Sequence, residues 1–224
     1  AGVKESTGEY IFLLNPDTIC HDNSIKILLD NLKADHTIGV IGPNLINADS
    51  NPTHSFRRAG DGIITELNFS LFGLPYKALY GNNFEFNHSG KQIDVAYSCG
   101  AAMMMKRETF EKVGGFDESF FMYYEDQDLC NRIKKTGLRI VNEPSAIIQH
   151  LEGTSISLNS RREKYIIQSR KKYFLKTMPK WHFRVANILT KFFLLIGEFT
   201  YTLCGKKELA EKYSCRRNLI SEYE

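Results

Sequence analysis

The chain has 224 residues, 42% of them hydrophobic and 25% charged, which excludes a disordered chain and fits one globular domain with an extension. Its five cysteines are odd in number and form no Cys-x-x-Cys pair, which argues against a disulfide framework or a cysteine-based zinc site and favours a reducing compartment. The opening residues, AGVKESTGEY, lack the basic and apolar segments of a signal peptide.

The net charge of +3 is distributed unevenly along the sequence. Residues 1–159 carry fourteen basic and twenty acidic side chains, whereas residues 160–217 carry fifteen basic and four acidic ones. A basic C-terminal part joined to an acidic body favours an anionic partner, such as a membrane surface, a nucleic acid or a phosphorylated substrate.

The first half of the chain predicts a β–α–β unit. Residues 10–15 (YIFLLN) form an apolar run that ends at Pro16, which is typical of a buried strand. Asn23 can cap a helix in which apolar residues share one face, and residues 37–43 (TIGVIGP) predict the next strand. This order implies a parallel sheet.

The middle of the chain shows weaker patterns. Residues 54–93 have little periodicity and predict an irregular segment that determines specificity. Residues 94–105 (DVAYSCGAAMMM) predict a strand with a close backbone approach near Gly100, and a short helix follows at 106–113. Two further strands are expected, at 139–143 and 146–149, with His150 at the end of the second.

Two helices are expected to complete the chain, at about 159–178 and 182–203. The second is rich in apolar residues but contains Arg184, Lys191 and Glu198, so it is a poor transmembrane segment. Packing against the body and lying flat on a membrane surface are equally good interpretations of this helix.

The stretch YYEDQDLCNRIKKTG (residues 123–137) places three carboxylates in the first turn of an amphipathic helix. The structural interpretation is routine, because acidic residues suit a helix N-terminus and Asp128 can pair with Arg132. The functional interpretation is that Glu125 and Asp126 supply a general base aimed into a cleft.

Two short stretches could hold a metal ion. NPDT (residues 15–18) follows a strand, where ligands collect in open α/β sheets, and Asp17 offers a hard oxygen ligand. HLEGTS (residues 150–155) begins with a histidine at a strand end. Each has an ordinary structural alternative, namely an Asn-Pro-Asp turn and a structural histidine.

Together these stretches resemble family 2 glycosyltransferases, above all the rhamnosyltransferase-like members. The resemblance rests on GVKESTGEYIFLLNPDT, on residues 98–137 (SCGAAMMMKRETFEKVGGFDESFFMYYEDQDLCNRIKKTG) and on the His-x-x-Gly-x-Ser pattern formed by His150, Gly153 and Ser155. It covers roughly residues 2–178. It implies an α/β fold of the GT-A type, with a mostly parallel sheet, flanking helices and a C-terminal helical extension.

The resemblance also implies an inverting transfer of a sugar from a nucleotide-diphosphate sugar to an acceptor hydroxyl. Asp126 matches the family's catalytic base and Glu125 the acid beside it. Asp17 matches the metal-binding aspartate and His150 the second ligand of a divalent cation, Mg²⁺ or Mn²⁺. Such an ion would act as the Lewis acid for the leaving diphosphate.

The resemblance also implies a set of substrate-binding residues. Asn15 stands where some relatives have aspartate, Gly100 and Ala101 would line a sugar pocket with Cys99 nearby, and Arg170 would reach the diphosphate. The acceptor is expected to be a saccharide or lipid-linked saccharide of cell-surface polysaccharide synthesis. The basic helices would then hold the protein at the cytoplasmic face of the cell membrane, without a role for nucleic acid.

The sequence departs from the family in one respect. In the family, a nucleotide-binding half precedes the strand that ends in NPDT. About 80 residues, or two β–α units, are expected there and are absent from this sequence. The chain is therefore expected to comprise a partial catalytic domain (1–158) and a basic helical extension (159–224). The alternatives are an inactive remnant or interaction module that keeps the fold, and a metal-dependent phosphohydrolase that uses Asp17 and His150.

Overall fold

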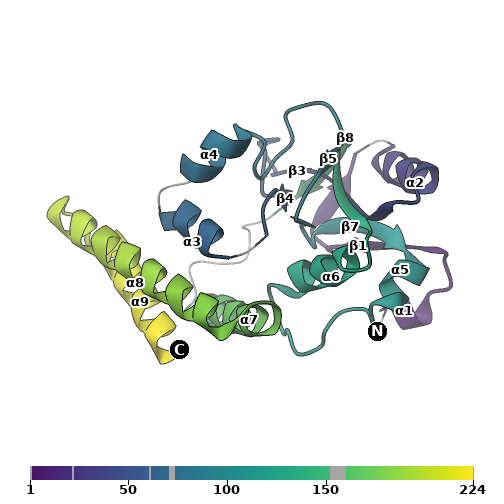
Figure 1. Ribbon diagram of the computed structural model, residues 1–224. Coiled ribbons are helices and arrows are strands. Elements are labelled where there is room, and N and C mark those ends of the chain that lie inside the picture. Colours follow the sequence, from purple (N-terminus) through teal and green to yellow (C-terminus); the bar gives the residue numbers. More distant parts are fainter. Residues whose placement is uncertain (1, 22, 61, 71–73, 152–159, 224) are drawn as a thin grey trace. The chain divides into compact units, whose positions relative to one another are not determined.

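The computed structural model describes residues 2–21, 23–60, 62–70, 74–151 and 160–223, which form two compact units (Figure 1). The sheet unit comprises residues 1–60, 80–119 and 125–156, and the helical unit comprises residues 61–79, 120–124 and 157–224. The expected division at residue 158 therefore differs in detail, because two segments from the middle of the chain join the C-terminal helices.

The sheet unit is built on one mixed sheet in the order β1-β7-β3-β8-β2, with β5 also paired to β8. The strands are β1 (Tyr10–Leu14), β2 (Thr18–Cys20), β3 (Ile38–Ile46), β5 (Ile93–Asp94), β7 (Ala102–Lys106) and β8 (Arg139–His150). Among these described strands, β3 and β8 pair in parallel, and the other hydrogen-bonded pairs are antiparallel. The expectation of a mostly parallel sheet is wrong, because β7 runs between β1 and β3 in the opposite direction.

Helices cover both faces of this sheet, as Figure 1 shows. On one face, Leu28 and Leu32 of α2 (Ser24–Ala34) pack against Ile41 and Val141. The other face is covered by α5 (Arg107–Lys112) and α6 (Glu125–Lys134). Neighbouring strand residues such as Val40 and Ile41 contribute to opposite cores, as the two-residue period of a strand requires.

Two local expectations change in the structure. Asn23 precedes α2 in a left-handed conformation (φ 62°) and makes no side-chain capping bond, whereas the Ser24 hydroxyl donates to the Ile147 carbonyl at 2.7 Å. The two strands expected around Pro144 are one strand, β8, because a register shift opposite Pro43 and Asn44 absorbs the interruption.

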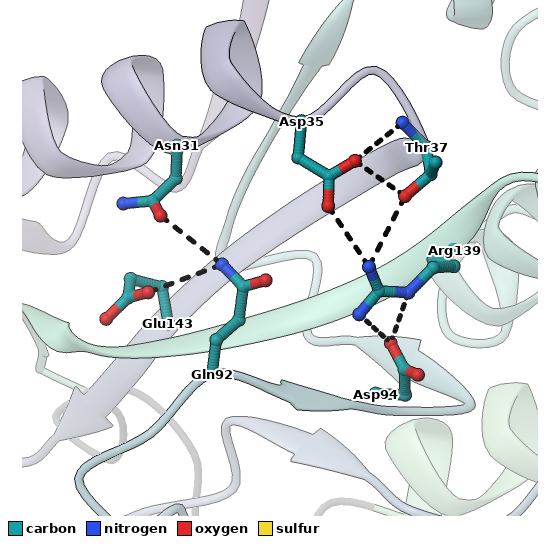
Figure 2. A network of polar contacts seen from close by, with 7 residues as sticks. All are labelled: Asn31, Asp35, Thr37, Gln92, Asp94, Arg139 and Glu143. Atoms are coloured by element: carbon teal, nitrogen blue, oxygen red, sulfur yellow. Dashed lines mark hydrogen bonds and ion pairs between the residues drawn. The ribbon is translucent and has the colours of Figure 1, made fainter.

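A polar network fixes the beginning of β8 (Figure 2). The Arg139 guanidinium lies 3.1 Å from Asp35 and 2.8 Å from Asp94, so it joins the α2–β3 turn to β5. Nearby, the Gln92 amide lies within 3.5 Å of both Asn31 and Glu143. These contacts bind β5 and α2 to β8.

Residues 54–93 are more regular than the sequence indicated. In the sheet unit, β4 (Phe56–Arg57) pairs antiparallel with β6 (Tyr97–Ser98) as a second small sheet. In the helical unit, the same stretch forms α3 (Ile63–Ser70) and α4 (Leu74–Tyr80). Tyr76 is almost fully buried and bonds Thr65 at 2.6 Å, a tertiary contact that weak local periodicity does not reveal.

The helical unit also contains α7 (Ser160–Thr177), α8 (Lys180–Leu203) and α9 (Lys207–Glu222). The first two match the expected helices, and α9, which runs beside α8 in Figure 1, was not expected. None of the helices in the described part of the chain has the length and apolarity needed to cross a membrane. A four-residue helix, α1 (Gly2–Glu5), begins the chain.

Candidate functional site

The polar residues that follow β1 meet the histidine that ends β8. Asp17 Oδ1 lies 3.4 Å from His150 Nε2, and the Asn15 amide nitrogen lies 3.4 Å from the same ring nitrogen. The register of β2 on β8 places Thr18 opposite His150 and explains this meeting. Sequence positions far apart are thus brought to one edge of the sheet.

The position of this edge follows from strand direction. Strands β1 and β8 run the same way, because β7 is antiparallel to both β1 and β3 and β3 is parallel to β8. Their carboxyl ends therefore share an edge with the beginning of β7, where Gly100 and Ala101 lie. Ligands of open α/β sheets bind at such carboxyl ends.

The Asp17–His150 pair fits a divalent cation that also binds phosphate. Two ligands at about 2.1 Å from one ion and at right angles are about 3 Å apart, close to the observed 3.4 Å separation. His150 is buried, whereas the Asp17 side chain is 47% exposed, which leaves room for oxygen ligands from a substrate. Among the described residues no group of three or more His, Cys, Asp or Glu could hold a metal, so Asp17 and His150 by themselves would be an incomplete ligand set.

Asp126 is held at the beginning of α6 by backbone donors. The Gly100 N–H donates to Asp126 Oδ2 at 2.9 Å, and the Gln127 N–H donates to Oδ1 at 2.8 Å. A Cβ at position 100 would lie 3.2 Å from the Asp126 Cβ, so glycine permits this close approach. Burial raises the pKa of Asp126, and the hydrogen bonds from Gly100 and Gln127 and the charge of His54 offset only part of this effect.

The neighbouring acids have different environments. Burial raises the pKa of Glu125, and the charge of Asp126 adds to this effect. Glu125 Oε2 is buried without a hydrogen-bond partner in the described part of the structure. Asp128, by contrast, pairs with Arg132 at 2.8 Å inside the helix, which confirms its structural interpretation.

Two hydrogen bonds of the backbone connect Asp126, the candidate base, to the segment that carries Asp17, a candidate metal ligand. The Asn15 N–H donates to the Ala101 carbonyl at 2.9 Å, and the preceding residue, Gly100, holds Asp126. Ala101 itself is buried in a core cluster with Cys99 packed against it, so these two residues shape the site through the backbone. Gly153 and Ser155 of the histidine motif lie outside the described residues.

Arg170 has a different place from the one expected. It is buried in the helical unit, where its guanidinium lies 2.8 Å from Glu66 and 2.6 Å from the Asn187 side-chain oxygen and stacks near Phe174. A buried arginine engaged by a carboxylate is a structural ion pair. The structure therefore gives no support to Arg170 as a diphosphate ligand.

A polar group around His54, which the residue pattern did not predict, lies beside the short strand β6. His54 Nε2 lies 3.0 Å from the Tyr97 hydroxyl, and His54 Nδ1 lies 3.6 Å from Glu85. His54 and Glu85 belong to the stretch 54–93, whose weak periodicity predicted no regular structure, and the pairing of β4 with β6 brings this stretch to the strand that leads to Gly100.

The fold and the site together define a class of protein. The structure of GalNAc-T7 with UDP, GalNAc and Mn²⁺ superposes with a TM-score of 0.54 over 99% of this chain and 41% of that one, at 14% identity. At this identity the likeness concerns the fold, which is that of the GT-A glycosyltransferases.

The chain belongs to glycosyl transferase family 2, whose family model matches residues 1–114. Residues 82–153 also match the model described as the N-terminal domain of galactosyltransferase. The family and the GT-A fold expected from the sequence are thereby confirmed.

Among curated proteins, the chain is similar to two rhamnosyltransferases. It is 30% identical over 146 residues to N-acetylglucosaminyl-diphospho-decaprenol L-rhamnosyltransferase of Mycobacterium tuberculosis, covering 63% of this chain and 47% of that protein. It is 28% identical over 142 residues to rhamnosyltransferase WbbL of Escherichia coli, covering 61% and 50%. The chain thus spans about half the length of these relatives.

Proposed function

We propose that this chain carries the metal-binding and acceptor-side part of an inverting glycosyltransferase, which moves a sugar from a nucleotide-diphosphate sugar to an acceptor hydroxyl. The observation that supports this most strongly is the placement of the Asp17–His150 pair and the Gly100–Asp126 pair along one edge of the sheet. The first pair suits a leaving diphosphate, and the second supplies a base.

In this proposal Asp126 takes the proton of the acceptor hydroxyl as the acceptor oxygen forms its bond to the anomeric carbon. The bond between that carbon and the diphosphate oxygen breaks in the same step, and the diphosphate leaves with the electron pair. The two backbone N–H donors fix the Asp126 carboxylate, and its raised pKa brings it closer to the operating pH, where a general base is most effective. Activity should fall as acid protonates this carboxylate.

Asp17 and His150 would hold the divalent cation. When bound, Mg²⁺ or Mn²⁺ supplies positive charge that stabilises the departing diphosphate. In the structure the Asn15 amide lies against His150 Nε2, so this amide must turn away before the nitrogen can act as a ligand. Asn15 would then lie beside the ion or the phosphates without adding a negative charge.

The substrate class is supported by the named relatives. One is a rhamnosyltransferase that acts on a diphospho-decaprenol, and the solved structure of GalNAc-T7 contains UDP and Mn²⁺. We infer by analogy a saccharide or lipid-linked saccharide acceptor, and a role in cell-surface polysaccharide synthesis.

We further propose that α8 lies on an anionic membrane surface, which would place the protein where lipid-linked acceptors occur. Exposed apolar side chains recur along this helix at spacings of three, four and seven residues, which places them on one face: Trp181, Ile188, Phe192, Leu195, Phe199 and Leu203. Arg184 and Lys191 flank this face, and the surrounding sequence is strongly basic. Apolar residues flanked by cations are typical of interfacial helices.

Binding of nucleotide diphosphates to the full-length protein tests the metal site. Calorimetric titration should show binding of UDP, GDP or dTDP that weakens at least about tenfold when Mn²⁺ is omitted or Asp17 is changed to Ala. Asp30→Ala, at an exposed position of α2, should bind like the wild type. Absence of binding would favour the inactive remnant, and release of free sugar without transfer to any acceptor would favour the phosphohydrolase.

The membrane proposal can be tested with the single tryptophan of the chain, because Trp181 lies on the proposed face and is 60% exposed. Its emission should shift to the blue with vesicles of phosphatidylcholine and phosphatidylglycerol, and less with phosphatidylcholine alone. Phe199→Glu should weaken vesicle binding, whereas Thr200→Glu, the exposed neighbour about 100° around the helix, should not. Equal binding by both variants would contradict the proposal.

A further inference from the structure

We propose that the segment Phe120–Tyr124, together with the face of α7 that it covers, is a second surface of the helical unit that contacts an anionic membrane. This surface extends the membrane role proposed for α8, but it consists of different residues and can be tested separately.

The segment lies along α7 and contacts it through side chains and backbone. The ring centroids of Phe121 and Tyr165 are 5.0 Å apart, and the Ser169 hydroxyl donates to the Met122 carbonyl at 2.7 Å. The α7 residues in contact with the segment recur at spacings of three and four, so they share one face of the helix. They are Arg162, Tyr165, Ser169, Lys172, Tyr173 and Lys176.

The ends of the segment are packed in the core of the helical unit, whereas two residues in its middle are exposed to solvent. Phe120 is buried in a hydrophobic cluster with Phe183 of α8, and Tyr124 packs against the same cluster. Phe121 is 76% exposed, the largest fraction among the large hydrophobic side chains of the described residues, and Met122 is 41% exposed. Two large apolar side chains that a firmly packed segment leaves in solvent indicate a surface for a partner.

The backbone of the segment contributes to this exposure. Tyr123 and Tyr124 both have left-handed conformations, with φ of 66° and 68°. Bulky residues rarely adopt this conformation, so the contacts with α7 and with the hydrophobic cluster must stabilise it. The exposure of Phe121 and Met122 is therefore a fixed property of the folded unit.

Cations flank the exposed pair. The Nζ atoms of Lys172 and Lys176 lie 5.5 Å and 5.6 Å from the centroid of the Phe120 ring. The Arg162 guanidinium carbon lies 5.6 Å from the centroid of the Tyr123 ring. All three cationic side chains are exposed, so an anionic surface can reach them.

The balance of charge on α7 is also positive. The helix carries seven basic residues and one acidic residue, Glu163, which pairs with Arg216 of α9 at 3.4 Å. An apolar pair flanked by cations suits the boundary between lipid phosphates and acyl chains, where both kinds of side chain are stabilised. A neutral saccharide could stack on Phe121 but would gain nothing from the cations, so an anionic membrane fits the surface better.

The position of the segment in the chain gives this contact a purpose. Glu125 and Asp126 follow Tyr124 directly. Contact with the membrane would hold the residues just before the base at the lipid surface, where lipid-linked acceptors occur. This purpose rests on the proposed function, whereas the membrane contact itself does not.

The test is the fluorescence of a tryptophan placed in the segment. In Phe121→Trp combined with Trp181→Phe, the single tryptophan of the chain is moved to position 121. Its emission should shift to the blue with vesicles of phosphatidylcholine and phosphatidylglycerol, and brominated acyl chains should quench it. Vesicles of phosphatidylcholine alone should give a smaller response, because they offer the cations no net negative charge.

Sedimentation with the same vesicles measures the contribution of each side chain. Phe121→Glu should weaken vesicle binding by at least about tenfold, and Lys172→Gln by about fivefold. Ile25→Glu makes a similar change at a 46% exposed position of the sheet unit and should bind like the wild type. No spectral shift at position 121, or unchanged binding by a folded Phe121→Glu protein, would overturn the inference.

These measurements separate the segment from α8 and from the chemistry. If Trp181 of the wild type responds to vesicles and the reporter at position 121 does not, α8 contacts the membrane and the segment does not. If the reporter responds and Phe199→Glu binds vesicles normally, the segment contacts the membrane and α8 does not. Normal vesicle binding by Phe121→Glu with a raised KM for a soluble acceptor would make the segment a saccharide surface and overturn the inference. Vesicle binding requires no turnover, so it stands or falls independently of the proposed sugar transfer.

Discussion

The two units of the molecule differ in what they do with large hydrophobic side chains. The sheet unit buries nearly all of them between its strands and helices, in cores that include Met103, Leu129 and Ile133. The helical unit holds most of the large hydrophobic side chains that remain exposed, including Phe121 and Phe199. Both units bury polar groups: the helical unit buries the ion pair of Glu66 and Arg170, and the sheet unit places the candidate residues Asp17 and His150 at one edge of its sheet.

This contrast suits the two proposed tasks, catalysis by the sheet unit and membrane binding by the helical unit. A catalytic site needs rigid backbone donors, which the sheet unit supplies through Gly100 and the β7 strand. A surface that binds lipid needs exposed apolar area with flanking cations, which the helical unit supplies through α8. Three experiments test this difference between the two units, in order of decreasing expected effect.

The largest effect is expected for Asp126→Asn in the full-length protein. Loss of the proton acceptor should lower turnover by at least about 100-fold while binding of the nucleotide sugar is retained. Phe199→Glu, in the helical unit, should leave turnover with a soluble acceptor unchanged. The measurement is the steady-state rate with a panel of nucleotide-diphosphate sugars, and near-normal turnover of Asp126→Asn would require another base.

An effect of intermediate size, on the free energy of unfolding, is expected when an isoleucine is changed to alanine in each unit. Ile133 is fully buried, so Ile133→Ala should lower the free energy of unfolding by about 2–5 kcal/mol through lost burial and the cavity left behind. Ile188 is 63% exposed, so Ile188→Ala should change it by less than about 0.5 kcal/mol. Urea denaturation followed by circular dichroism measures both values, and a large loss for Ile188→Ala would show that its face is packed rather than free.

The smallest effect is expected for Arg139→Gln at the network in Figure 2. The hydroxyl and the backbone N–H of Thr37, with a smaller contribution from the charge of Arg139, lower the pKa of Asp35. The stabilisation from the Asp35 carboxylate is therefore present at neutral pH and is lost as the pH falls through its lowered folded-state value.

Thermal melts of the wild type and of Arg139→Gln should accordingly differ slightly at pH 7 and converge as acid protonates the Asp35 carboxylate. Lys26→Gln, which removes an exposed ion pair within one helix, provides a control for the loss of a surface charge. A difference that grows in acid would contradict the assignment of Asp35 as the partner.

The family, the order of most elements and the residues of the proposed chemistry could be predicted from the amino-acid pattern alone. Contiguous patterns carried this information: the apolar run before Asn15, the acidic first turn at Glu125, and the strand that ends at His150. Local periods and helix-end preferences depend on neighbouring residues, so they can be read without coordinates. The helix predicted at about 182–203, which is α8 in the structure, could be recognised from its apolar pattern for the same reason.

Features that depend on the pairing of distant strands could not be predicted in this way. The antiparallel insertion of β7, the single strand β8 across Pro144 and the helices α3 and α4 are set by hydrogen-bond partners and packing far away in the sequence. The same holds for Arg170, which pairs with Glu66, and for His54, which contacts Tyr97 of β6. Local residue patterns do not predict such long-range contacts, because these contacts form and contribute free energy only when the chain has folded.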